Sequence, residues 1–83
     1  MTKYVATIRV RPKPEIRDPQ GEAIAGALRS LGTDVAEVRA GKEIVVRFAA
    51  PDADAARSSA TKMGDQLLAN PVIEEFAVEV AAE

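Results

Sequence analysis

The sequence predicts an α+β fold of the ferredoxin-like type, with the element order β-α-β-β-α-β and two helices on one face of an antiparallel sheet. Segments that alternate apolar and polar residues stand near both ends and in the middle of the chain, and two segments with helical periodicity separate them. No linker or low-complexity tract divides the 83 residues. We therefore expect a single domain over residues 1–83.

The first two predicted elements are a strand and a helix. Residues 3–11 (KYVATIRVR) alternate, and we expect Tyr4 to begin the row that faces the core. Residues 19–31 follow as a helix, with Asp18 as the N-cap, Pro19 as the first helical residue and Gly32 as the stop signal. The apolar side of this helix carries Ala23, Ile24, Ala27, Leu28 and Leu31.

The remaining elements are two central strands, a second helix and a last strand. Residues 33–50 divide at Gly41 and Lys42 into two short strands, which predicts a hairpin. Residues 52–70 predict a helix whose core-facing residues are Ala56, Ala60, Met63 and Leu67. Residues 74–80 alternate again and predict the final strand.

The sheet face opposite the helices is a predicted surface for self-association. Val5, Val45 and Val35 are expected on that face, where no helix of the same chain would cover them. A chain this short also has a thin core, for which oligomerisation is a common remedy. We expect a homo-oligomer, at least a dimer and either a dimer or a tetramer, that associates through sheet surfaces.

The composition argues against a catalytic site on this chain. The sequence contains neither cysteine nor histidine, so the usual nucleophile–base pairs and the commonest transition-metal ligands are missing. The acidic residues Glu74, Glu75 and Glu79 alternate along a strand, which indicates a solvated surface instead of a metal site. No apolar segment approaches the ~20 residues that span a bilayer, so we expect a cytoplasmic protein that does not enter membranes.

Two other functions of ferredoxin-like domains do not suit this sequence, and a third stays open. The chain has three aromatic residues and a net charge of −2, and its third strand, EIVVRF, lacks the base-stacking motif of RNA-binding domains; we expect no nucleic acid partner. Acylphosphatase-like catalysis needs an asparagine that positions a water molecule. The only asparagine is Asn70, which is expected at a helix end and does not suit this role. A free-standing, ACT-like domain that binds a small molecule has the same element order and stays open as an alternative.

Three motifs nevertheless identify a family. They are DPQG at residues 18–21, VRAGK at residues 38–42 and LLANPVIE at residues 67–74. In this order, and with a final alternating strand, the chain closely resembles PurS, the small subunit of phosphoribosylformylglycinamidine synthase. The resemblance extends from Ile8 to Val80, and the loop PKPEIR is the main departure from it.

The resemblance implies a non-catalytic subunit of a complex that makes purines. In the family's complex a synthetase subunit, PurL, binds ATP and magnesium with formylglycinamide ribonucleotide, and a glutaminase subunit, PurQ, releases ammonia from glutamine. The small subunit is thought to bridge them and to assist ammonia transfer. This implies a subunit of a glutamine-dependent ligase that has no cofactor and no catalytic residue of its own.

The residues expected to meet partner subunits lie in these motifs and beside them. Gly21 is notable, since a glycine in the first turn of a helix lowers its stability. A close approach by the backbone of a partner subunit would explain it, and mere tolerance of the glycine is the alternative. The predicted interface residues are Asp18, Pro19, Gln20, Gly21, Arg39, Gly41, Lys42, Asn70 and Pro71.

Overall fold

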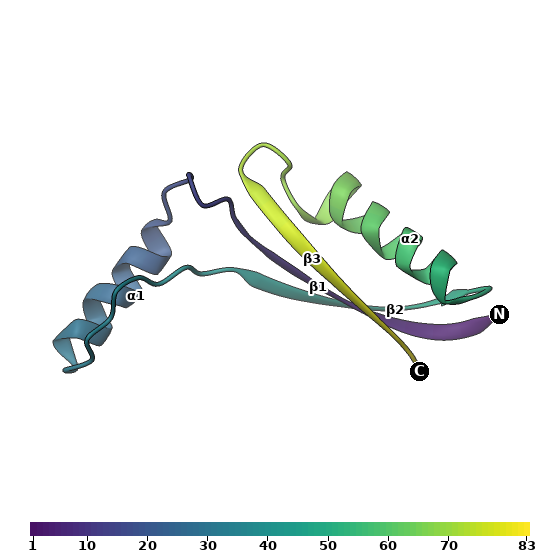
Figure 1. Cartoon of the computed structure of the whole chain (residues 1–83), viewed down its shortest axis with the longest axis horizontal. Coiled ribbons are helices and arrows are strands. Elements are labelled where there is room, and N and C mark those ends of the chain that lie inside the picture. The colour runs from purple at the N-terminus through teal and green to yellow at the C-terminus, as the bar shows by residue number, and fades with distance from the viewer.

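A three-stranded antiparallel sheet forms the centre of the chain, and the computed structural model describes all residues 1–83. Strand β1 (Thr2–Pro12) lies between β2 (Lys42–Ala50) and β3 (Glu74–Ala82), as Figure 1 shows. Ile8 is opposite Ile44 on one side and Val78 on the other, so apolar residues line up across one face. The predicted first, third and last strands are therefore confirmed.

The core lies between this face and helix α2 (Ala53–Met63). The inward row of β1 is the most buried part of the chain, with Ile8 fully buried and Val10 2% exposed. Ala56 and Ala60 of α2 are also fully buried. Their short side chains let the helix approach the sheet closely, which excludes water from the centre of a small core.

The helix does not continue regularly to Asn70. Residues Gly64–Leu68 form a π-helical turn, and the N–H of Ala69 donates to the carbonyl of Gly64 at 3.0 Å. The wider turn moves the next core position from Leu67 to Leu68. Leu67 is 81% exposed, and Leu68 packs on the core instead. The prediction that Leu67 faces the core is therefore wrong.

Helix α1 (Pro19–Ser30) lies beyond the end of the sheet and not against it (Figure 1). Residues 33–41 form no strand, so the predicted hairpin at Gly41 and Lys42 is not formed within the chain. The α+β class with an antiparallel sheet and two helices is confirmed. The arrangement differs in that the sheet has three strands and only α2 covers it.

The sheet face opposite α2 is largely polar. Val5 and Val45 lie on it, as predicted, but Val35 does not, because its segment leaves the sheet. Arg9 is 3.2 Å from Glu43 in an exposed ion pair on the same face. A second ion pair joins Arg11 and Glu75 at 2.9 Å. Two of the three predicted valines are therefore on this face, and ion pairs lie among them.

Candidate functional site

Asp18 joins two segments that are far apart in the sequence. Its Oδ1 accepts a hydrogen bond from the backbone N–H of Gly21 at 3.0 Å, which caps α1 as predicted. Its Oδ2 accepts from the backbone N–H of Ala40 at 2.7 Å. One buried carboxylate thus fixes the start of α1 to the chain that returns from its end.

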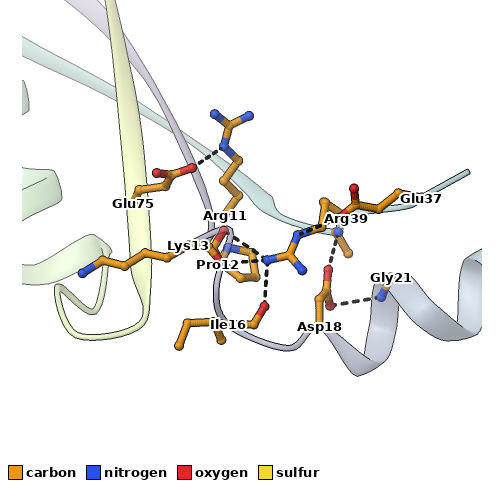
Figure 2. A network of polar contacts seen from close by, with 10 residues as sticks. Arg11, Pro12, Lys13, Ile16, Asp18, Gly21, Glu37, Arg39 and Glu75 are labelled. Atoms are coloured by element: carbon orange, nitrogen blue, oxygen red, sulfur yellow. Dashed lines mark hydrogen bonds and ion pairs between the residues drawn. The ribbon is translucent and has the colours of Figure 1, made fainter.

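Arg39, on the segment that returns from α1, binds the backbone of the segment that leads into α1. Its Nη2 donates to the carbonyl oxygens of Lys13 at 2.8 Å and Ile16 at 2.9 Å, and lies 3.4 Å from the carbonyl of Pro12 (Figure 2). A guanidinium suits this position because its donors point in several fixed directions. We call Asp18 and Arg39, with these partners, the clasp.

The electrostatics of the clasp keep Asp18 ionised. The backbone N–H groups of Gly21 and Ala40 hold the pKa of this carboxyl below its ordinary value, and the charge of Arg39 acts in the same direction. Burial opposes these effects, but it is the weaker influence. A carboxylate that is ionised near neutral pH and accepts backbone hydrogen bonds is a structural group and not a proton donor.

The structure explains Gly21 by a contact within the chain. A Cβ atom at this position would lie 2.6 Å from Oδ2 of Asp18 and 3.0 Å from the carbonyl carbon of Val38, with the Val38 oxygen closer still. The backbone that approaches the first turn of α1 therefore belongs to the same chain. The expectation that a partner backbone explains this glycine is corrected.

Gly41 and Lys42 mark the point where the returning segment enters the sheet. A Cβ atom on Gly41 would contact the carbonyl oxygen of Val10 and would lie 3.2 Å from Cβ of Arg11. Lys42 is exposed and is opposite Val10 in the register of β1 and β2. The glycine therefore lets the segment pass close to β1, while the lysine faces solvent.

Asn70 and Pro71 shape the loop between α2 and β3. The side-chain oxygen of Asn70 accepts a hydrogen bond from the backbone N–H of Val72 at 3.0 Å. The backbone N–H of Asn70 donates to Oε1 of Glu74 at 2.7 Å. This tight turn leaves Val72 75% exposed, close in sequence to the exposed Leu67. We call Leu67, Val72 and Ile73 the loop patch. These residues were not predicted as an interface, because helical periodicity placed Leu67 in the core and the sequence does not show that Val72 and Ile73 are exposed.

The clasp and the loop patch lie at the same end of the sheet. The N–H of Lys13 donates to the carbonyl of Ile73 at 2.9 Å, which fixes the loop beside the segment that leads to α1. Figure 2 shows this loop beside Lys13 and the clasp. All the predicted interface residues are therefore brought to one region, although the sequence separates them into three motifs.

A shallow depression of about 490 Å³ borders the clasp, with Arg39, Gly41 and Lys42 in its wall. Its charged residues include both signs, and Arg11 and Glu75, which form an ion pair, are among the residues that line it. The structure contains no group of three or more Asp or Glu side chains that could hold a metal ion. No helix is both long and apolar enough to cross a membrane.

Such a chain has the character of an assembly subunit: a small α+β protein with exposed apolar residues and a helix held away from its own sheet. The comparison with known families agrees with this class. The model of the family "PurS: Phosphoribosylformylglycinamidine (FGAM) synthase" matches residues 5–82. The chain belongs to the PurS family, the small subunits of phosphoribosylformylglycinamidine synthase.

Individual relatives support this assignment. The chain is 42% identical to subunit PurS of phosphoribosylformylglycinamidine synthase from Synechocystis sp., over 95% of this chain and 80% of that protein. It is 41% identical to the solved PurS of Thermus thermophilus, with a TM-score of 0.83, covering 93% of this chain and 95% of that one.

A third relative comes from a complex. A chain in the structure of PurLQS from Thermotoga maritima matches with 34% identity and a TM-score of 0.89, covering 98% of this chain and 100% of that chain. These relatives favour the synthase subunit over the alternative of a free-standing, ACT-like domain.

Proposed function

We propose that this chain bridges the synthetase subunit, PurL, and the glutaminase subunit, PurQ, and assists the passage of ammonia between them. The observation that carries the proposal is the match over nearly its whole length to a chain of the PurLQS structure from Thermotoga maritima. A match that includes α1, although α1 does not pack on its own sheet, supports an arrangement suited to assembly.

The division of chemistry follows from the residues present. Without cysteine or histidine, this chain lacks the usual means to release ammonia from glutamine. The ATP, the magnesium and the reacting groups would lie on the partner subunits, and the complex would act in the cytoplasm. The chain itself would supply surfaces, and a homo-oligomer would present them more than once.

The partner surface is proposed at the end of the sheet that carries the clasp and the loop patch. Leu67 and Val72 are among the most exposed large apolar residues of the chain. Apolar residues that are surrounded by polar groups mark protein interfaces more often than isolated ones do. The predicted residues Pro19, Gln20, Lys42 and Pro71 are exposed in the same region and would form its polar rim.

The experiment is reconstitution with PurL and PurQ from the same organism. We expect this chain to raise glutamine-dependent synthesis and to leave synthesis from added ammonium salt unchanged, because only the first needs ammonia from PurQ. Equal glutamine-dependent rates with and without the chain would overturn the bridging role.

Two matched variants test where the partners bind. Val72→Lys places a charge in the loop patch, and Val45→Lys places the same charge on the polar sheet face, where Val45 is 57% exposed. We expect Val72→Lys to weaken the interaction with the partner subunits at least tenfold and Val45→Lys to leave it unchanged. A larger loss of binding for Val45→Lys than for Val72→Lys would place the interface on the polar sheet face instead.

A further inference from the structure

The depression beside the clasp is large enough to hold a small molecule. Its volume is about 490 Å³, and small-molecule sites commonly measure ~300–1,000 Å³. It lies on the polar sheet face, because Glu43 and Ala77, which line it, are both opposite Arg9 in the register of the sheet. The bridging role proposed above does not use this depression.

Two positions without bulky side chains leave the depression open. Ala77 is exposed and directly opposite Arg9 in the register of β1 and β3. Gly41 has no side chain, and a Cβ atom there would lie 3.2 Å from Cβ of Arg11. A larger side chain at either position would occupy the space beside these arginines. The depression is therefore lined by long cationic side chains and has small residues between them.

Three arginines that line the depression keep N–H groups with no partner in the chain. Arg11 uses only Nε, which donates to Glu75, and Figure 2 shows both of its Nη atoms pointing away from that carboxylate. Arg39 uses Nη2 for the carbonyls of the clasp, and no hydrogen bond occupies its Nη1. Arg9 uses Nε and Nη2 for two carboxylates and keeps Nη1 free. These free groups are available to an acceptor that enters the depression.

The charges of the lining favour an anion, although the chain as a whole has a net charge of −2. Four cationic and two acidic residues line the depression: Arg9, Arg11, Arg39, Lys42, Glu43 and Glu75. Two more carboxylates lie outside the lining, with Glu79 3.3 Å from Arg9 and Glu37 4.0 Å from Arg39. The four glutamate side chains are at least 39% exposed. Exposed ion pairs are weak, so these carboxylates can share the arginines with a second anion.

We propose that the depression binds the phosphate group of a small, soluble phosphate monoester through Arg9, Arg11 and Arg39. Such a group carries close to two negative charges near neutral pH and has three acceptor oxygens, so it can accept from more than one guanidinium at once. The planar fork of an arginine matches phosphate oxygens in pairs. The site does not depend on the bridging role, because every residue in it belongs to this chain.

The first test titrates the ¹⁵N-labelled full chain with glycerol 3-phosphate and follows its backbone amides by NMR. The titration is made at about pH 7.5, where the phosphate group is almost fully ionised, and at constant ionic strength. We expect saturable shifts at Arg11, Gly41 and Ala77, and none with sodium acetate or with glycerol. Equal shifts with acetate would show that any anion is accepted, and they would overturn the proposal, as would the absence of saturable shifts.

The variant Arg11→Gln removes the arginine with the most free donors, and Arg47→Gln is its control. Both arginines lie on the polar sheet face, their side chains are 71% and 72% exposed, and each pairs with one glutamate. We expect Arg11→Gln to weaken binding of glycerol 3-phosphate at least tenfold, as the loss of charge-assisted hydrogen bonds requires, and Arg47→Gln to leave it unchanged. Equal weakening would mean that the general charge of this face attracts the anion, and there would be no site.

A second pair of variants adds a negative charge and leaves the arginines in place. Ala77→Asp puts a carboxylate between the arginines, opposite Arg9, and Ala81→Asp puts one on the same face of the same strand, opposite Val5. Both alanines are exposed, so the fold should tolerate either change. We expect Ala77→Asp to abolish the saturable shifts and Ala81→Asp to retain them. Binding that survives Ala77→Asp would place the anion outside this depression.

Discussion

The substitution Gly21→Ala tests the clasp most directly, because it adds a single methyl group at its centre. That methyl group would lie 2.6 Å from Oδ2 of Asp18 and 3.0 Å from the carbonyl carbon of Val38. Ordinary van der Waals contacts of carbon are about 3.5–4.0 Å, so one of these groups has to move. The groups that must move are backbone and a carboxylate that is held by two hydrogen bonds.

Two opposing effects decide the sign of the change in stability. Alanine is favoured over glycine in a helix by at most ~1 kcal/mol, and less in the first turn. Forcing a methyl group into a filled site costs about 1–3 kcal/mol. We therefore expect Gly21→Ala to lower the free energy of unfolding by about 1 kcal/mol, although the same change in most helices raises it.

Gly26→Ala is the matched control, since Gly26 lies in the same helix with nothing within 4 Å of the added methyl group. It should raise the stability by up to ~1 kcal/mol, which moves the Tm by roughly 4–8 °C in a domain of this size. The assay is thermal unfolding by circular dichroism at one fixed protein concentration, because association makes the Tm depend on concentration. An increase in Tm for Gly21→Ala equal to that of Gly26→Ala would refute the internal contact as the reason for this glycine.

Two further predictions concern α2 and the clasp. Gly64→Ala should lower the free energy of unfolding by about 1–3 kcal/mol, because its methyl group would lie 2.5 Å from Cδ2 of Phe76; an unchanged or higher Tm would contradict this. The lowered pKa of Asp18 stabilises the fold above the pKa of an unfolded aspartate, about 3.9, and this contribution is lost as the pH falls through the still lower folded pKa. The difference in Tm between the natural chain and Asp18→Asn should therefore be constant near neutral pH and shrink below about pH 4; a difference that does not change with pH would show that the charge is not what matters.

The sequence predicts the elements that local patterns determine. The inward row of β1 and the N-cap Asp18 follow from periodicity and capping preferences, and the structure contains both of them. The π-helical turn is different, because it begins at a tertiary contact: Gly64, its first residue, lies against the ring of Phe76 on β3. Periodicity within the helix could not show that Leu68 replaces Leu67 in the core.

The missing hairpin also has a long-range cause. Residues 33–40 contain apolar residues at a spacing that suits a strand, and a pattern of this kind does not reveal which backbone groups are already occupied. In the structure the carbonyl of Val35 accepts from Arg29, and the N–H of Ala40 donates to Asp18. These partners lie on α1 and at its N-cap, so the segment runs along the helix and not beside β2. The sequence therefore predicts the strand and misses the competing side chains.

The clasp also changes how the predicted interface residues are understood. Asp18 and Arg39 direct their charged groups to the backbone of their own chain. The carbonyl of Val38 fills the space that a side chain at Gly21 would need. Two motifs that the sequence separates by sixteen residues, Gly21 to Val38, are thus the two halves of one structural contact. The carboxylate of Asp18 and Nη2 of Arg39 already have partners within the chain, so fewer polar groups of the clasp are free to contact another protein.

Partner recognition then depends on the residues that the clasp leaves free. Pro19, Gln20 and Lys42 are exposed around it, and the loop patch beside it presents Leu67 and Val72. Interface energy concentrates in a few well-packed apolar or aromatic residues, with polar contacts at the rim. We therefore expect substitutions in the loop patch to weaken partner binding directly. Substitutions in the clasp should act through the position of α1, and a loss of partner binding there should be accompanied by a lower Tm.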